Sequence, residues 1–159
     1  MSDLAIRLAV SAALLLLVTA HSVRCTGDTC YNGGGVQDVS LAPGQSITSR
    51  NGRVMLVLQT DGDLVVKCTE TWRPVWHSGT GRRYVNHMNR AVLQRDGNLA
   101  VLDHRGVAIY NSNSQHRGGA MLVVQDDGNV VMYSNYGRAV WDTRTRGHCG
   151  DTVYDVIEG

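Results

Sequence analysis

The sequence has no phenylalanine, two prolines, one lysine (Lys67) and almost no net charge. Its 15 Lys and Arg side chains nearly balance 14 Asp and Glu, which leaves a formal charge of +1. A nucleic-acid-binding domain usually carries a marked basic excess, so this balance speaks against a nucleic-acid partner. Apolar residues make up 43% of the 159 positions and alternate with polar ones, which also argues against disorder. The length fits one domain of ordinary size.

Motifs of common enzymes and metal sites are missing as well. The sequence contains no G-x-S-x-G, no H-E-x-x-H and no glycine-rich phosphate loop followed by lysine. Five of the six histidines lie scattered among polar residues, as expected of surface or loop positions: His77, His87, His104, His116 and His148. We therefore predict no catalytic residues, no metal site and no enzymatic activity.

The N-terminal 20 residues form the pattern of a secretory signal peptide. One arginine, Arg7, precedes an apolar run over 8–18, and Val18 and Ala20 occupy the −3 and −1 positions of a cleavage site before His21. The run is too short for a resident membrane span. We expect a signal peptide at 1–20, a domain at 21–150, and a tail at 151–159 that is flexible or trimmed. The protein would enter the secretory pathway without inserting into a membrane.

Four cysteines remain after cleavage, and export favours disulfides over free thiols. Their positions do not give the paired C-x-x-C spacing of a zinc site. Three pairings are open, and a bond between two chains through Cys149 is open too. The cysteines are Cys25, Cys30, Cys68 and Cys149. The chain has no Asn-x-Ser/Thr sequon, so we expect no N-linked glycan.

The chain repeats itself three times. The segments 58–67, 93–102 and 124–133 align, and an aromatic residue follows each at a similar distance. The glutamines are 35 and 31 residues apart and the aromatics 34 and 31. The two spacings therefore change together from one repeat to the next, as expected of a true internal repeat. The glutamines are Gln59, Gln94 and Gln125, and the aromatics are Trp76, Tyr110 and Trp141.

Each repeat is typical of β-structure. Asp-Gly pairs at 61–62, 96–97 and 127–128 lie between apolar stretches, and such a dipeptide favours a tight hairpin turn. No ten residues keep a helical period without glycine, so the fold class is all-β. One unit cannot bury a core alone, but three around an axis can. We expect the three aromatics to meet at the common centre in a structural role.

In the third unit a polar constellation recurs at every second residue. Gln125, Asp127, Asn129, Val131 and Tyr133 can share one face of a strand, because side chains alternate between faces. Amides, a carboxylate and a phenol beside an apolar wall suit a ligand rich in hydroxyls, such as a sugar. Asp and Asn are also common turn-forming residues, but a turn does not require the Gln and the Tyr.

These residues resemble a known family. Gln-x-Asp-x-Asn-x-Val-x-Tyr, intact over 125–133, looks like the signature of the monocot mannose-binding lectins, also called bulb-type or snowdrop-type lectins. The three motifs, their aromatics and the segment from Leu41-Ala-Pro-Gly44 to Gln59 are similar to that family too. The resemblance covers roughly 28–148.

The resemblance implies a β-prism II fold, with three four-stranded antiparallel sheets around a pseudo-threefold axis. It also implies calcium-independent binding of mannose at up to three sites, without a cofactor. Asp127 and Asn129 would bind the axial 2-hydroxyl, Gln125 the 3-hydroxyl and Tyr133 the 4-hydroxyl, with Val131 as the hydrophobic contact. Family members form dimers and tetramers, often by exchange of C-terminal strands, and a role in defence is expected.

The other two units depart from the signature. The second keeps Gln94, Asp96 and Asn98, but Ala100 and Leu102 replace Val and Tyr, so we expect a degenerate site. The first keeps Gln59, Asp61 and Val65, but Asp63 replaces Asn and Lys67 replaces Tyr, so we expect an inactive or altered site. The family's internal disulfide is absent, since its first cysteine falls at Gly62.

We expect a mannose-binding homo- or hetero-oligomer, a dimer or tetramer, secreted or vacuolar. One alternative is a lectin-like protein without sugar binding, a storage, antifungal or taste-active protein that acts through its surface. A weaker alternative is a β-trefoil, whose three repeats are usually longer.

Overall fold

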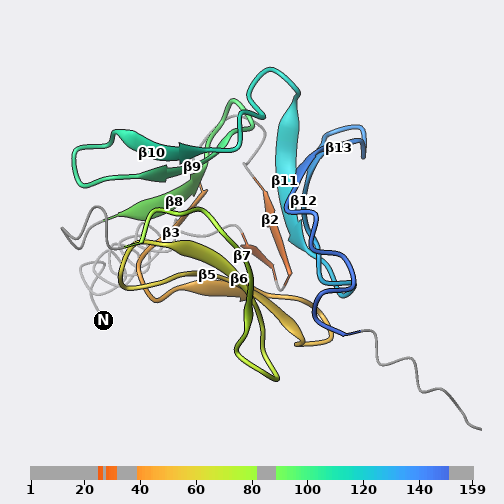
Figure 1. The fold of residues 1–159 in the computed structure, drawn as a ribbon. Coiled ribbons are helices and arrows are strands. Elements are labelled where there is room, and N and C mark those ends of the chain that lie inside the picture. The colour runs from red at the N-terminus through yellow and green to blue at the C-terminus, as the bar shows by residue number, and fades with distance from the viewer. Residues whose placement is uncertain (1–24, 27, 32–38, 82–88, 151–159) are drawn as a thin grey trace, which may run out of the picture.

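The computed structural model describes residues 25–26, 28–31, 39–81 and 89–150, and all regular elements among them are strands (Figure 1). The expected signal peptide and the C-terminal tail lie outside the described residues. The strands are β1 (Cys25–Thr26), β2 (Thr29–Tyr31), β3 (Val39–Leu41), β4 (Ser46–Thr48), β5 (Val54–Leu58), β6 (Leu64–Cys68), β7 (Pro74–His77), β8 (Arg90–Leu93), β9 (Leu99–Leu102), β10 (Ala108–Asn111), β11 (Gly119–Val124), β12 (Val130–Ser134) and β13 (Ala139–Asp142).

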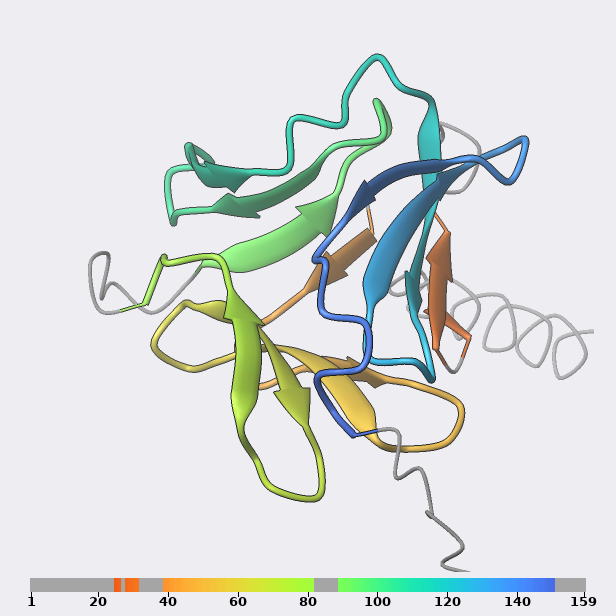
Figure 2. The ribbon, with the colours of Figure 1, turned by 45° about the vertical axis from the view of Figure 1, so that its right-hand side comes forward.

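The strands form three antiparallel sheets that enclose a shared interior (Figures 1 and 2). The first unit gives the order β4-β5-β6-β7, the second β10-β9-β8-β3, and the third β1-β2-β11-β12-β13. Each repeat thus supplies three strands, and the segment before the first repeat supplies the remaining ones. The predicted all-β fold with three sheets is confirmed. The two-residue strand β1 adds a fifth strand to the third sheet.

The interior follows from the alternation of side chains along each strand. In β5, Val54, Leu56 and Leu58 are buried and the two residues between them are less so. Val130 and Met132 of β12 point into the same core cluster, together with Leu93 of β8. Burial of these aliphatic side chains from all three sheets stabilises the fold, since no single sheet could shield its own apolar face.

The three repeat aromatics meet as predicted. Trp76 contacts Tyr110 and Trp141 edge to face, with ring centroids 5.7 and 5.9 Å apart. All three pack against the core cluster. Edge-to-face contacts place the positive edge of one ring against the negative face of another, so the trio stabilises the junction of the sheets.

The Asp-Gly pairs form the hairpin turns of the three units. In the third turn the Gly128 N–H donates to the Gln125 carbonyl and the Gln125 N–H donates to the Asn129 carbonyl, at 3.2 and 2.8 Å. Gly128 has a φ of 96°, a left-handed conformation that glycine adopts without steric cost. A type I turn closed by such a residue is a common hairpin connection. It places Asp127 at the tip, next to the strand that carries Val131 and Tyr133.

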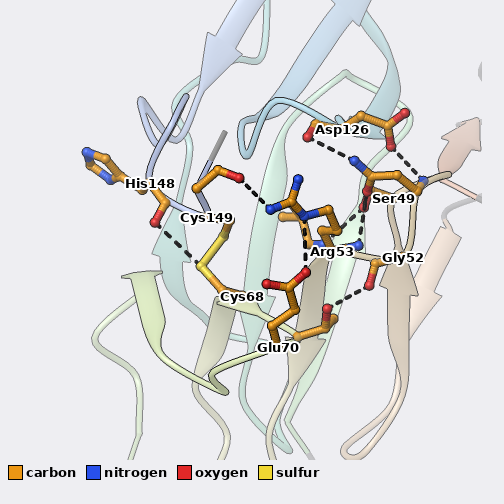
Figure 3. Close-up of polar contacts among 12 residues, drawn as sticks. Ser49, Gly52, Arg53, Cys68, Glu70, Asp126, His148 and Cys149 are labelled. Carbon is orange, nitrogen blue, oxygen red and sulfur yellow. Dashed lines mark hydrogen bonds and ion pairs between the residues drawn. A yellow bond between two sulfur atoms is a disulfide. The ribbon is translucent and has the colours of Figure 1, made fainter. Parts of the chain in front are cut away.

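The C-terminal segment is fastened to the first unit (Figure 3). Cys68 of β6 and Cys149 form a disulfide within the chain, which corrects the option of an interchain bond through Cys149. The guanidinium of Arg53 donates to the Gly150 carbonyl at 2.6 Å, and that of Arg73 donates to the His148 carbonyl at 2.6 Å. Cys30 is also disulfide-bonded. This clamp joins the last described residues of the third unit to the first sheet.

Burial of Tyr110 gives the fold a pH dependence on the alkaline side. Burial raises the pKa of its phenol from 10.0 to about 12. The native state therefore keeps a proton that the unfolded chain loses, and this contribution to stability is complete below pH 10.0 and disappears as the pH rises through about 12. We expect unfolding free energy to fall less steeply over this window in Tyr110→Phe than in the parent. Urea titrations at both ends of this pH window measure the unfolding free energy of both proteins. Parallel pH profiles would contradict the raised pKa of Tyr110.

Candidate functional site

The five predicted side chains of the third unit gather around one hairpin. Gln125 follows β11, Asp127 lies in the turn, and Val131 and Tyr133 lie on β12. Val130 and Met132 point into the core, so the strand's alternation directs Val131 and Tyr133 to the opposite face. The Gln125 side-chain amide donates to the Tyr133 hydroxyl at 2.7 Å. This bond leaves the Gln125 carbonyl oxygen and the phenolic proton for a ligand.

Asp127 and Asn129 have structural contacts in addition to their exposed atoms. The Asp127 carboxylate accepts from the Asn129 backbone N–H at 3.0 Å, and its other oxygen lies 3.2 Å from the Arg146 guanidinium. The Asp127 side chain is 32% exposed, so the carboxylate stays within reach of a ligand. The turn-forming and the ligand-binding interpretations of Asp127 are therefore compatible. One of its oxygens closes the turn, and the other pairs with the exposed guanidinium of Arg146.

Asn129 is nearly buried and held from several sides. Its carbonyl oxygen accepts from the Thr143 hydroxyl at 3.0 Å and the Thr145 backbone N–H at 3.2 Å. Its amide nitrogen donates to the Asp142 carboxylate at 3.0 Å. These contacts engage one of the two amide hydrogens. The second is the donor that Asn129 can offer to a sugar hydroxyl.

Sequence reasoning missed the residues that hold this asparagine, although the chain carries a signal for them. Each repeat aromatic is followed by a polar residue and then by Ser or Thr at the second and fourth positions: His77-Ser78-Gly79-Thr80, Asn111-Ser112-Asn113-Ser114 and Asp142-Thr143-Arg144-Thr145. The last hydroxyl of each set donates to the carbonyl of the turn glycine, at 2.7 Å to Gly62, 2.8 Å to Gly97 and 2.7 Å to Gly128. This tetrapeptide fastens every turn to the end of its own sheet.

In the second unit the same framework leaves less for a ligand. The Asn98 amide nitrogen donates to both the Gln94 side-chain carbonyl and the Asn111 side chain, at 3.0 and 2.7 Å. Both amide hydrogens of Asn98 are thus engaged inside the protein. Asp96 still accepts from the Asn98 backbone N–H at 3.0 Å. Leu102 stands at the tyrosine position and offers no hydroxyl.

In the first unit the donor and acceptor roles of two contacts are reversed relative to the third unit. The Asp63 carboxylate stands where the third unit has the Asn129 amide. It lies 3.5 Å from the imidazole of His77, which stands where the third unit has the Asp142 carboxylate. The Lys67 ammonium donates to the Gln59 side-chain carbonyl at 2.7 Å, where the third unit has glutamine donating to tyrosine. Asp63 also accepts from the Ser78 hydroxyl at 2.8 Å. The exchanges fit one another, so this turn keeps its shape but presents the Lys67 ammonium where the third unit has a phenol.

The described ranges 25–26, 28–31, 39–81 and 89–150 contain neither a candidate metal cluster nor a candidate membrane-spanning helix. No group of three or more His, Cys, Asp or Glu side chains in those ranges is placed to hold a metal ion. Within the same ranges no helix has the length and apolar character to cross a membrane.

Comparisons with known proteins agree with the geometry. No protein-family model matches the chain. A mannose-specific lectin from Aloe arborescens is 36% identical over 96 residues, which cover 59% of this chain and 82% of that protein. The structure of a monomeric monocot mannose-binding lectin from Gastrodia elata has 32% identity and a TM-score of 0.63, covering 76% of this chain and 99% of that one. The snowdrop (Galanthus nivalis) mannose-specific agglutinin complexed with methyl-α-D-mannoside has 27% identity and a TM-score of 0.57, with coverage of 68% and 90%.

Proposed function

Because the chain belongs to the family of monocot mannose-binding (bulb-type) lectins and has their β-prism II fold, we propose that it binds mannose-containing glycans through its third unit, without calcium. The relatives are lectins, and this chain is a lectin and not an enzyme. The main support for the proposal is the difference in side-chain hydrogen bonding between the three turns. In the third turn the glutamine donates to a tyrosine hydroxyl, and the asparagine keeps one amide hydrogen that can donate to a ligand.

The roles of the side chains follow from the groups they leave available. Asp127 accepts from the axial 2-hydroxyl of mannose, and the remaining amide hydrogen of Asn129 donates to it. Gln125 binds the 3-hydroxyl and Tyr133 the 4-hydroxyl. Val131 is 4% exposed and lies in register between Val123 and Asp142, so it forms the floor against the ring carbons.

The other two units contribute less. The second site is degenerate, since Asn98 has both amide hydrogens engaged and Leu102 lacks a hydroxyl. The first site is inactive toward mannose, because Asp63 cannot donate as an amide does and is already bound to Ser78 and Thr80. A shallow monosaccharide site has a dissociation constant of about 1 mM, or roughly −4 kcal/mol.

Such weak binding favours several sites in one assembly. Two or more tethered sites on a multivalent glycan raise the avidity by about 10²–10⁴-fold without new contacts.

We infer a homo- or hetero-dimer or tetramer, acting outside the cell or in the vacuole after passage through the secretory pathway, in a defence role. Light scattering on the mature protein tests the assembly. A monomer at working concentration would contradict it.

The equivalent glutamines provide a matched test of the site. Gln125→Ala removes the ligand for the 3-hydroxyl and the partner of Tyr133, so we expect calorimetry with methyl α-mannoside to show at least about tenfold weaker binding. Gln94→Ala and Gln59→Ala make the same change in the other units and should leave the affinity within about twofold.

The opposite pattern would be equally clear. Loss of binding in Gln59→Ala with retention in Gln125→Ala would place the site in the first unit. Absence of binding in the parent, for oligomannose as well as the monosaccharide, would leave the fold acting as a lectin-like scaffold without sugar binding.

A further inference from the structure

A basic groove runs along the free edge of β13, beside the third site. Strand β13 is the last strand of its sheet, as Figure 1 shows at the outer edge of the molecule. Two adjoining hollows meet there and share Arg117, Ala139 and Val140 as lining residues. One extends to Arg138 and the other to Arg144.

The charges of this groove are unbalanced. Three arginines line it, Arg117, Arg138 and Arg144, and Asp142 is the carboxylate among its lining residues. Asp142 already accepts from the Asn129 amide, and Arg144 lies 4.0 Å from its other oxygen. A guanidinium presents its donors as a planar fork that suits phosphate, sulfate or carboxylate. The groove is therefore built to accept an anion.

Arg117 is fixed in an orientation that serves this purpose. Its Nη1 donates to the Val140 carbonyl at 3.1 Å, which fastens the guanidinium to the edge of β13. A guanidinium has five N–H donors, so this bond leaves others for a ligand in the groove. Its position against the strand lowers the conformational entropy that the side chain would lose on binding.

Arg144 occupies a backbone position that disfavours it. Its φ is 58°, in the left-handed region. The equivalent positions in the first and second units are Gly79 (φ 74°) and Asn113 (φ 54°), and glycine and asparagine are the residues that tolerate this conformation best. The third unit thus carries a strained arginine where its sister units carry unstrained residues. Strain of this kind is typical of functional positions.

The groove and the third site share a wall. Asp142 lines the groove and also holds the Asn129 amide that would meet the sugar. We propose that the groove binds an anionic ester, phosphate or sulfate, on a glycan whose mannose occupies the third site. This inference rests on the proposed function and extends it to the substrate class. The ligand is then a negatively charged mannose-containing glycan.

Paired glycans test the inference. Binding of an oligomannose glycan is compared with that of the same glycan carrying a phosphate ester on its terminal mannose, and with its sulfate ester. We expect an ester to bind about tenfold more tightly than the neutral glycan at low salt, with the gain decreasing as salt screens the arginines. Free inorganic phosphate should compete with that gain and leave neutral binding unchanged.

Arg144→Asn is the decisive variant, because it installs the residue of the second unit. It should remove most of the gain, keep the affinity for the neutral glycan, and raise the melting temperature by relieving the strained backbone. Arg117→Gln should also remove most of the gain. Arg50→Gln removes one exposed arginine from the β4–β5 turn and is the control, which should keep the gain.

Equal affinity of the parent for neutral and esterified glycans would overturn the inference and leave the proposed function intact. An equal loss in Arg50→Gln would also overturn it, because the gain would then reflect overall charge. Failure of the parent to bind any of the glycans would refute the proposed function and the inference together.

Discussion

Replacing Cys68 and Cys149 together by serine is expected to lower the free energy of unfolding by about 2–5 kcal/mol. The disulfide joins residues 81 positions apart and therefore closes a long loop. In the chain-entropy account, a loop of this length restricts the unfolded chain strongly, and its loss stabilises the unfolded state relative to the native one. The effect should exceed that of any single surface substitution.

Urea unfolding followed by tryptophan fluorescence measures this change. The matched control is Arg73→Gln, which removes a hydrogen bond of the same clamp, to the His148 carbonyl, and keeps the covalent link. We expect the control to cost about 1 kcal/mol. An unchanged midpoint in the double serine variant would show that the C-terminal segment is held to the first sheet without the disulfide.

Asn129→Asp is expected to abolish mannose binding and to destabilise the protein by about 2–4 kcal/mol. The new carboxylate would face the Asp142 carboxylate across the 3.0 Å that the amide now bridges by donating a hydrogen. Asn129 is 9% exposed, so water screens the repulsion poorly. The substitution also removes the amide hydrogen proposed for the 2-hydroxyl.

The first unit supplies a compensating change that separates stability from binding. There an aspartate faces a histidine, Asp63 with His77, in the positions of Asn129 and Asp142. Asn129→Asp combined with Asp142→His copies this pair into the third unit. We expect the double variant to regain most of the unfolding free energy, measured in urea, while mannose binding stays lost.

The double variant could also give the opposite result for mannose binding. If the double variant regains mannose affinity along with stability, Asn129 acts only by holding the turn, and its amide does not contact the sugar. A single Asn129→Asp variant that binds mannose with parental affinity would contradict the assigned role directly.

The three hairpins were predictable from the sequence because their determinants are local. Asp-Gly between apolar stretches favours a turn, and the recurrence of Gln125, Asp127, Asn129, Val131 and Tyr133 at every second residue indicates which side chains share a face. The repeat also indicated that Trp76, Tyr110 and Trp141 would meet, since equivalent residues of three packed units approach one axis.

The cysteine pairing could not be predicted, because it depends on where the C-terminal segment lies in space. Residues Cys68 and Cys149 are brought together by the packing of the third unit against the first, and the spacing of the cysteines carries no trace of it. The strands β2 and β3 likewise pair with β11 and β8, far away in sequence. Only the assembled sheets determine these partners.

The prediction of an altered first site rested on Asp63 and Lys67 and did not include the contacts that those side chains make. Sequence reasoning noticed Asp63 and Lys67 and missed His77, which stands opposite Val65 in the β6–β7 register. Because that register shifts at a bulge between Val66 and Lys67, counting along the strands does not show which side chains meet. The recurrent polar tetrapeptide after each aromatic was the sequence signal that would have led to His77 and Asp142.

Amide NMR of the mature protein titrated with methyl α-mannoside tests, residue by residue, whether mannose binds at the third turn. We expect saturable chemical-shift changes at millimolar ligand in the third unit and none at the turn of the first unit. The shifts should concentrate at Gln125, Asp127, Asn129, Val131 and Tyr133. Shifts centred on the first unit, or no shifts with either the monosaccharide or oligomannose, would contradict binding at the third turn.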